Sequence, residues 1–239
     1  MGSKIDMVVF DMAGTTVNDE GNVTAAFASA MAAHGYEVPP ENINPLMGYK
    51  KPVAIKMMLA KFEPNAALIT DALIDRIHNR FVENMIQFYT TTTNLYPLPH
   101  VEEVFAALRA KQIKVCLNTG FSRDIADVII DRLQWWPKQL IDDVVASDEV
   151  QEGRPAPFMI HSLMQRAGIA DAARVVKVGD TEVDINEGKN TGCVATIGIT
   201  TGAFTKQGLA TYGPNFIIDD MSELLAIVDG INANGSGIA

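Results

Sequence analysis

The sequence is poor in cysteine and contains no long apolar run. Its 239 residues include two cysteines, Cys116 and Cys193, each within an apolar strand-like segment, so we expect reduced core thiols and no disulfide. No apolar run approaches the ~18 residues that cross a bilayer, so no membrane partner is expected. The N-terminal residues lack a basic and then apolar signal region. We therefore predict a cytoplasmic protein.

Positive charge is also scarce. The chain has 19 Lys and Arg against 29 Asp and Glu, a net charge of −10. Nucleic acids and anionic lipids attract clustered Lys and Arg, so neither is expected as the main partner. The four histidines show no metal-binding spacing and are expected to be surface or packing residues: His34, His78, His100 and His161. A small anionic substrate, bound by local positive groups, stays compatible with this composition.

The composition is otherwise that of an ordinary soluble protein, and the chain divides into two parts with different patterns of apolar residues. Apolar residues make up 48% and charged residues 20%. Residues 18–96 show only helical periodicity, with helices expected over 23–34, 53–62 and 66–89. From Pro97 onward, helices alternate with apolar strands. Such alternation predicts a Rossmann-like α/β fold, in which helices cover both faces of a parallel sheet.

The expected strands lie at 7–10, 113–117, 144–145, 175–178 and 194–199, and the expected helices of the second part at 101–110, 123–133, 158–167 and 183–190. The predicted architecture is an α/β core that an all-helical cap interrupts after the first strand. We assign residues 1–17 and 97–231 to the core, 18–96 to the cap and 232–239 to a disordered tail. A cap in this position excludes water and supplies specificity residues.

Asp11 is the first candidate site residue. It follows the apolar strand at 7–10 and precedes a turn that contains Gly14. Ligands of open α/β sheets gather at the carboxyl ends of strands, where loop N–H groups can hold phosphate. Asp11 is thus placed as a nucleophile. Ala13 carries no proton donor, so a reaction at phosphorus would proceed without an acid at that position.

Two further segments have the chemistry of phosphate binding. Thr119 and Gly120 follow the second strand, and their hydroxyl and amide groups can bind phosphate oxygens. Ser122 after them also suits an N-cap of the next helix, whatever the function. Arg154 precedes a helix in a proline-rich loop and has the planar fork that fits phosphate. The alternative for Arg154 is a solvated surface residue.

Asp180 and Asp184 follow the strand expected at 175–178. Carboxylates at a strand end suit a hard cation such as Mg²⁺, which prefers oxygen ligands. Asp184 has an alternative role, because Thr181 and Asp184 have the spacing of a capping box that starts a helix. Asp180 lies in the loop itself, so capping does not account for it.

Taken together, these segments resemble the four motifs of the haloacid dehalogenase superfamily. They are Asp-Met-Ala-Gly-Thr-Thr at 11–16, Asn-Thr-Gly at 118–120, Gly-Arg-Pro at 153–155 and Gly-Asp-Thr-Glu-Val-Asp at 179–184. The resemblance implies a Rossmann-like core with an inserted helical cap and an aspartyl-phosphate on Asp11. It also implies Mg²⁺ as cofactor. The expected metal ligands are Asp11, the Ala13 carbonyl, Asp180 and Asp184, and the expected substrate-binding residues are Met12, Ala13, Thr119, Gly120 and Arg154.

Within that superfamily the chain is similar to the phosphonoacetaldehyde hydrolase branch. There, alanine replaces the phosphatase acid, and a cap lysine forms an imine that turns the carbon leaving group into an enamine. Lys51, four residues after Met47, is at the position of that lysine. A lysine desolvated under a cap loses its proton near neutral pH, as imine chemistry requires. The alternative is a solvated helix start before Pro52.

The chain departs from that branch at three positions. Met12 replaces a Trp, Phe121 stands where a Tyr follows Thr-Gly, and Ala54 stands in place of a cap histidine. We therefore expect a small phosphonate or phosphate substrate. The leading hypothesis is Mg²⁺-dependent cleavage of a phosphorus–carbon bond. The alternatives are a phosphatase for acyl phosphates or esters with good leaving groups, and a non-catalytic phosphate-ligand binder. By analogy with related enzymes, a homodimer is also expected.

Overall fold

The centre of the protein is a parallel β-sheet. The computed structural model describes residues 5–234, and within them six strands form one sheet in the order β3-β2-β1-β4-β5-β6. The strands are β1 (Met7–Phe10), β2 (Lys114–Thr119), β3 (Asp143–Ala146), β4 (Val175–Gly179), β5 (Ala195–Ile199) and β6 (Phe216–Ile218). All neighbouring pairs are parallel. The predicted α/β fold is confirmed, and the central position of β1 brings Asp11 to the middle of the sheet's carboxyl edge.

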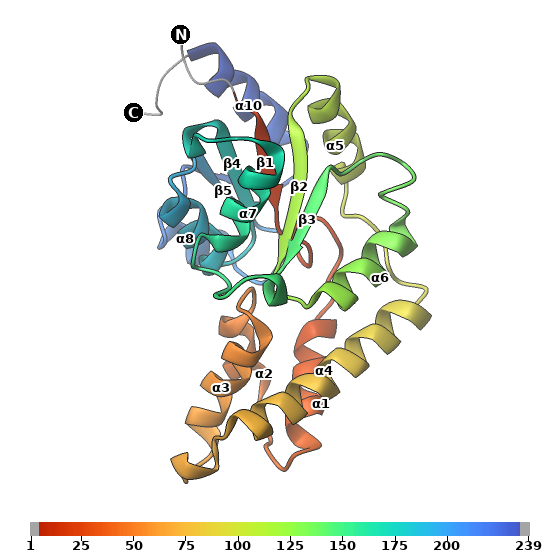
Figure 1. Cartoon of the computed structure of the whole chain (residues 1–239), viewed down its shortest axis with the longest axis vertical. Coiled ribbons are helices and arrows are strands. Elements are labelled where there is room, and N and C mark those ends of the chain that lie inside the picture. The colour runs from red at the N-terminus through yellow and green to blue at the C-terminus, as the bar shows by residue number, and fades with distance from the viewer. Residues whose placement is uncertain (1–4, 235–239) are drawn as a thin grey trace.

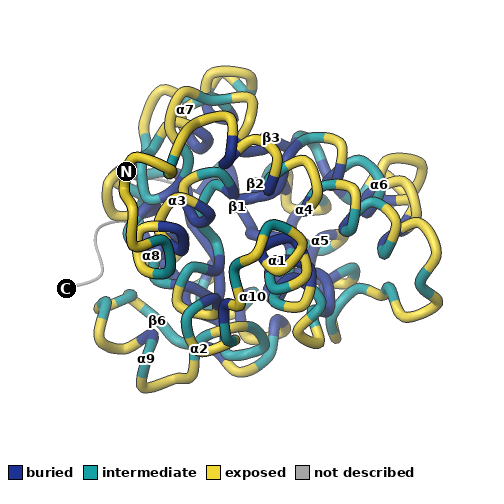
Figure 2. Tube along the Cα trace, turned by 90° about the horizontal axis from the view of Figure 1, so that it is seen from below, coloured by how far each residue is buried: buried dark blue, intermediate teal, exposed yellow. Residues whose placement is uncertain are grey.

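Helices cover both faces of the sheet, which explains why its strands are apolar on both sides. Val8 and Phe10 of β1 pack in one cluster with α5 (Val101–Ala110), α6 (Arg123–Leu133) and α10 (Glu223–Asn234). Met7 and Val9 point the other way, because side chains alternate along a strand, and pack against α7 (Phe158–Ala167). On that side α8 (Glu182–Thr191) contacts β4 and β5. Figure 2 shows the strands buried among helices whose outer sides are exposed.

A second group of helices lies beyond the carboxyl edge of the sheet (Figure 1). We call this group the helical unit; it comprises α1 (Asn22–Ala32), α2 (Pro40–Ile43), α3 (Lys51–Phe62) and α4 (Asp71–Thr91). Helices α1 and α4 pack together through Phe27 and Phe81, whose ring centroids are 4.3 Å apart. The structure describes all residues of 18–96 and places no strand among them. The helical unit therefore stands as a separate layer over the edge that carries Asp11.

The two chain segments that join the helical unit to the sheet are hydrogen-bonded to each other. The N–H of Asn18 donates to the carbonyl of Tyr96 at 3.2 Å, and the N–H of Tyr96 donates to Asn18 Oδ1 at 3.0 Å. Two residues nearer the sheet along each segment, Leu98 N–H donates to the carbonyl of Thr16 at 3.0 Å. The outgoing and returning segments thus form one short ribbon rather than two independent linkers.

Three expectations about the elements need correction. The helix expected over 66–89 is divided into a 3-10 turn (Ala66–Leu68) and α4, because the Thr70 hydroxyl accepts the N–H of Leu73 and starts a new helix. The sequence interpretation also missed α2, α9 (Lys206–Ala210), β6 and α10. Residues 232–234, which the prediction placed in the tail, belong to α10.

The last turn of α10 is held in place by the beginning of the chain. The amide of Ile5 donates to Asn232 Oδ1 at 2.8 Å, so both ends of the described chain meet far from the helical unit (Figure 1). Residues 235–239, the rest of the predicted tail, lie outside the described residues. Among residues 5–234, no helix combines the length and apolarity that a bilayer crossing requires.

Candidate active site

A cavity of about 270 Å³ lies between the sheet edge and the helical unit. Both layers contribute to its wall, since Asp11 and Asp180 come from strand ends and Lys51 comes from the first turn of α3. The predicted site residues that line it are Asp11, Ala13, Lys51, Thr119, Gly120, Arg154 and Asp180. The fold therefore brings together, at one place, side chains that are far apart in the sequence.

Asp11 is fixed at the carboxyl end of β1. Its N–H donates to the carbonyl of Val178 at 3.0 Å, which continues the pairing of β1 with β4 beyond the last strand residue. The side chain is 5% exposed and forms an ion pair with Arg154 at 2.7 Å. Burial raises the pKa of the Asp11 carboxyl, and the charge of Arg154 offsets part of that rise.

Asp180 is held beside Asp11 by groups from two loops. Its oxygens accept the hydroxyl of Thr15 at 2.9 Å and the N–H of Ala203 at 2.7 Å. Gly14 is at φ +85°, and a Cβ on it would lie 2.8 Å from Asp180 Oδ2, so the turn requires glycine both for its backbone and for space. Burial, followed by the charges of Asp11 and Asp184, raises the pKa of Asp180 to about 8.

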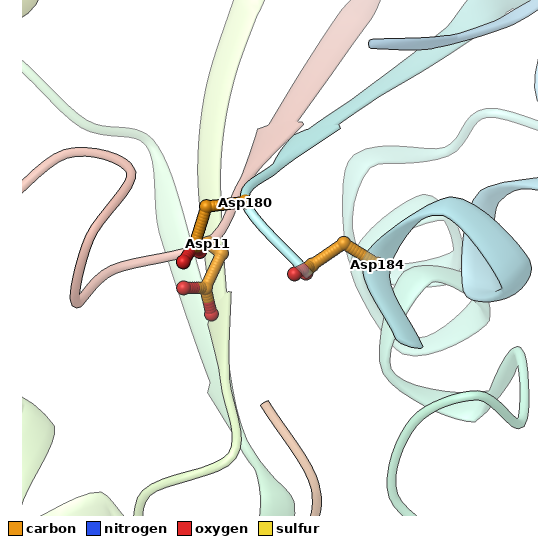
Figure 3. A group of neighbouring side chains, drawn as sticks. All are labelled: Asp11, Asp180 and Asp184. Carbon is orange, nitrogen blue, oxygen red and sulfur yellow. The ribbon is translucent and has the colours of Figure 1, made fainter. Parts of the chain in front are cut away.

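The carboxylates of Asp11, Asp180 and Asp184 have the donor set of a metal site (Figure 3). One oxygen from each lies within 4.8 Å of the others, and all three side chains are buried. After burial, the charges of Asp11 and Asp184 also raise the pKa of Asp180, and a hard divalent cation relieves such repulsion with oxygen ligands. These residues therefore fit a cation such as Mg²⁺, and Ala13 lines the same cavity.

Arg154 is the buried cation of the site. It is 3% exposed and forms ion pairs with Asp11 and Asp184 through Nη1. Burial opposes the charge of the guanidinium, but the two carboxylates outweigh it and raise the pKa of Arg154. Its Nε is buried without a hydrogen-bond partner in the described part of the chain. Arg154 lines the cavity, and the surface alternative for it does not hold.

A second group of buried polar residues, which the sequence interpretation missed, supports Asp184 from behind. Lys177 is fully buried, and its Nζ lies 2.6 Å from Asn118 Oδ1, 3.0 Å from Asp184 Oδ1 and 3.6 Å from Glu187 Oε2. Asn118 donates in turn to both oxygens of Glu187 at 2.8 Å. One signal was present in the sequence: Lys177 interrupts an otherwise apolar central strand, a position that a lysine occupies only with partners.

The pKa values of the two acids of α8 in this group, Asp184 and Glu187, shift in opposite directions. Burial opposes ionisation of Asp184, but the charges of Arg154 and Lys177 prevail and lower its pKa to about 2. Burial also dominates at Glu187, where it raises the pKa to about 7 despite the charge of Lys177. Asp184 is therefore the firm anion that holds Arg154 and Lys177 in place.

Lys51 lies in the cavity, and its solvated alternative does not hold. The side chain is 4% exposed, and its Nζ lies 5.0, 5.4 and 6.0 Å from the ring centroids of Phe121, Phe27 and Phe81. Burial, followed by the charge of Arg154, lowers the pKa of Lys51 to about 8. An appreciable share of the amine is therefore unprotonated near neutral pH. The adjacent Lys50 differs, because it donates to the carbonyl of Val150 at 3.0 Å.

The loop before α3 contacts the sheet edge beside the cavity. A Cβ on Gly48 would lie 2.6 Å from the Thr181 hydroxyl, so only glycine allows this close approach. Next to it, Tyr49 donates from its hydroxyl to Glu182 Oε1 at 2.7 Å. The loop that positions Lys51 is thus anchored to the same α8 segment that follows Asp180.

Three residues named in the sequence analysis lie outside the cavity lining. The side chain of Met12 is fully buried in the hydrophobic core, so it is not placed for the expected substrate contact. Asp184 lies behind the cavity wall, and its Oδ2 accepts the N–H of Thr181 at 3.2 Å and also its hydroxyl, which is the capping arrangement. Ser122 precedes α6 but its hydroxyl is buried without a partner, so it does not cap the helix.

Comparison with known proteins gives a consistent picture. The sequence profile of the haloacid dehalogenase-like hydrolases matches residues 5–192. Phosphonoacetaldehyde hydrolase from Latilactobacillus sakei subsp. sakei is 33% identical over 262 residues, covering 94% of this chain and 95% of that enzyme. Phosphonoacetaldehyde hydrolase from Bacteroides fragilis is 28% identical and covers 96% of this chain and 98% of its own.

Solved structures agree in fold. The crystal structure of a phosphonoacetaldehyde hydrolase-like protein from Oleispira antarctica matches with a TM-score of 0.82 at 22% identity, covering 99% of this chain and 97% of that one. At this level of identity the likeness extends to the arrangement of helices and strands, including the layer beyond the sheet edge.

Proposed function

Because this chain belongs to the haloacid dehalogenase-like hydrolases, in their phosphonoacetaldehyde hydrolase-like branch, we propose that it hydrolyses the phosphorus–carbon bond of a small phosphonate aldehyde. The observation that carries this proposal is the placement of Lys51. A buried amine with a pKa of about 8 lines the same cavity as Asp11 and Arg154. Hydrolysis of an ordinary phosphate ester does not require a neutral amine, whereas an aldehyde substrate can form an imine with it.

The absence of an acid at Ala13 supports the same proposal. An alkoxide leaving group needs a proton, and loss of a general acid typically removes a factor of ~10²–10⁴ in rate. A carbon leaving group activated as an enamine needs no such acid, because nitrogen takes up the electrons. If Lys51 activates the leaving group in this way, the reaction needs no general acid at the position of Ala13.

The proposed reaction begins at the aldehyde. Neutral Lys51 Nζ adds to the aldehyde carbon, and loss of water with uptake of one proton leaves an iminium ion. An Asp11 oxygen then attacks phosphorus, the phosphorus–carbon bond breaks, and its electron pair moves into the iminium to give an enamine and an aspartyl-phosphate. Water cleaves the acyl phosphate to release phosphate. The enamine gains a proton on carbon and becomes an iminium ion. Hydrolysis of this iminium releases the aldehyde without its phosphorus group and frees Lys51.

Positive groups must offset the repulsion between Asp11 and the phosphonate. Arg154 is already paired with Asp11, and Thr119 and Gly120 line the cavity near it. We assign the binding of the phosphonate oxygens to these residues. We assign Mg²⁺ to Asp11, the Ala13 carbonyl and Asp180, with Asp184 beside them holding Arg154. A bound cation supplies charge neutralisation as the phosphonate approaches the carboxylate.

We further propose that the helical unit is a cap over residues 18–96 and that residues 1–17 and 97–231 form the core. The supporting observations are the hydrogen-bonded ribbon at Asn18 and Tyr96 and the lining of one cavity by residues of both layers. A cap that contributes Lys51 couples closure to chemistry, because the amine and Asp11 meet only when the layers are together.

Trapping with borohydride tests the proposal directly. Incubation with phosphonoacetaldehyde and borohydride should reduce the imine and add the mass of the substrate-derived fragment to a peptide containing Lys51. Lys51→Met should abolish both the adduct and phosphate release, while Lys50→Met, which alters a lysine outside the cavity wall, should retain both. A wild-type protein that forms no adduct and releases no phosphate from phosphonates would remove the proposal.

The second candidate is a phosphatase for acyl phosphates or esters with stable leaving groups. Ala13 favours it equally, since such leaving groups need no acid. It predicts rates that rise steeply as the pKa of the leaving group falls and that persist in Lys51→Met. Phosphate release from phosphonates, acyl phosphates and sugar phosphates, each with and without Mg²⁺, separates the two candidates.

A further inference from the structure

The charged groups of the cavity fall into two sets. Among residues 5–234, five charged side chains line the cavity: Asp11, Asp19, Lys51, Arg154 and Asp180. Asp11 and Arg154 are paired, and Asp180 is held by Thr15 and Ala203. Those three form the phosphoryl end of the site. Asp19 and Lys51 are the other two charged residues of the lining, and neither is assigned to the phosphoryl group.

Asp19 is held rigidly at the start of α1. Its Oδ1 accepts the N–H of Asn22 at 2.8 Å and that of Val23 at 3.4 Å. The electrostatic effects of Asp19 and Lys51 on each other are reciprocal: the charge of Lys51 lowers the pKa of Asp19, and the charge of Asp19 raises the pKa of Lys51. Burial nevertheless prevails at Asp19 and raises its pKa. The carboxyl is thus displaced toward the protonated form in the same cavity as the amine.

Imine formation requires a proton carrier beside the amine. The added amine must lose a proton, and the hydroxyl of the carbinolamine must gain one before it leaves as water. The rings around Lys51 Nζ are those of Phe27, Phe81 and Phe121, which carry no exchangeable proton. Ala54, fully buried on the same helix as Lys51, carries none either.

We propose that Asp19 is the proton-transfer residue for imine chemistry at Lys51; this inference rests on the proposed function. Its carboxylate accepts the proton that the nitrogen loses on addition to the aldehyde carbon. The alkoxide takes a proton from solvent to become the carbinolamine hydroxyl. The proton held by Asp19 then passes to that hydroxyl, the carbon–oxygen bond breaks, and water departs with that bond's electron pair as the nitrogen lone pair forms the iminium. Hydrolysis of the product iminium uses these steps in reverse.

Asp19→Asn is the decisive variant, because an amide oxygen also caps a helix while carrying no titratable proton. With phosphonoacetaldehyde, we expect the rate of borohydride-trapped adduct at Lys51 and the rate of phosphate release each to fall by ~10²–10⁴. The melting temperature should stay at the wild-type value. Asp171→Asn is the matched control: Asp171 also accepts a backbone N–H, from Ala173, but is exposed and distant from the cavity. It should behave as wild type.

Each outcome separates this inference from the proposed function. Wild-type trapping and turnover by Asp19→Asn would overturn the role of Asp19 and leave the proposed function standing. Failure of the wild-type protein itself to form the Lys51 adduct would overturn both. If Asp19→Asn does not fold, Asp19→Ser, which also caps the helix without an ionisable group, gives the same test.

Discussion

Replacing Lys177 by Met should destabilise the protein severely without removing any group that lines the cavity. The Nζ of Lys177 lies 2.6 Å from Asn118, 3.0 Å from Asp184 and 3.6 Å from Glu187, all buried. Removal of one member of a buried ion pair costs about 3–5 kcal/mol, because the remaining charge is left without compensation. We expect Lys177→Met to lower the free energy of unfolding by about that amount.

The loss should depend on pH, and its direction follows from Glu187. Its pKa is about 7 in the folded protein, above the ordinary value, so the folded state holds this proton more tightly than the unfolded state. Stability therefore falls as pH rises from the ordinary glutamate pKa through 7. Without Lys177 the pKa of Glu187 should rise further, so Lys177→Met should lose additional stability at pH 8 relative to pH 6.

Urea unfolding followed by circular dichroism at both pH values measures the effect. The double variant Lys177→Met/Glu187→Gln removes both charges and keeps an acceptor for Asn118, so it should recover at least half of the loss. A single variant that costs less than about 1 kcal/mol, or a double variant less stable than the single, would refute the reasoning that the buried charges compensate one another.

Three other predictions concern the cavity. The rate of borohydride trapping at Lys51 should rise about tenfold per pH unit below 8 and level off above it, because the neutral amine reacts; a flat profile from pH 6 to 9 would contradict this. Mg²⁺ should raise the melting temperature of the wild type and of Asp171→Asn but not of Asp180→Asn, which lacks a ligand carboxylate. Tyr49→Phe removes the bond to Glu182 and should raise KM up to about tenfold at unchanged kcat; a change confined to kcat would contradict the anchoring role.

Much of the site was predictable because carboxyl ends of parallel strands share one edge. Asp11, Thr119 and Asp180 each follow a strand that periodicity alone identifies, and the order of β1, β2 and β4 in the sheet makes them neighbours. The α/β fold itself follows from the alternation of helices and strands. In both cases a local sequence pattern is sufficient, because residues at the carboxyl ends of adjacent parallel strands necessarily lie close together.

The remainder depends on packing that no local pattern reports. Lys177 and Glu187 find each other because a strand residue and a helix residue face inward on the same side of the sheet. The rings of Phe27 and Phe81 meet Lys51 only through the packing of α1, α3 and α4. In the sequence, Asp19 has the position of a residue that accepts N–H groups at the start of a helix, as it does for Asn22. Only the structure shows that it also lines the cavity.

The central position of β1 has a consequence for how the polypeptide reaches its native state. Met7 pairs with Lys114 on one side and with Val175 on the other, so the strand made earliest acquires both neighbours late. Non-local pairing of this kind slows folding and leaves apolar edges exposed in partly synthesised chains. Helices α1, α3 and α4 pack against one another, so they can assemble while β1 still lacks both neighbouring strands.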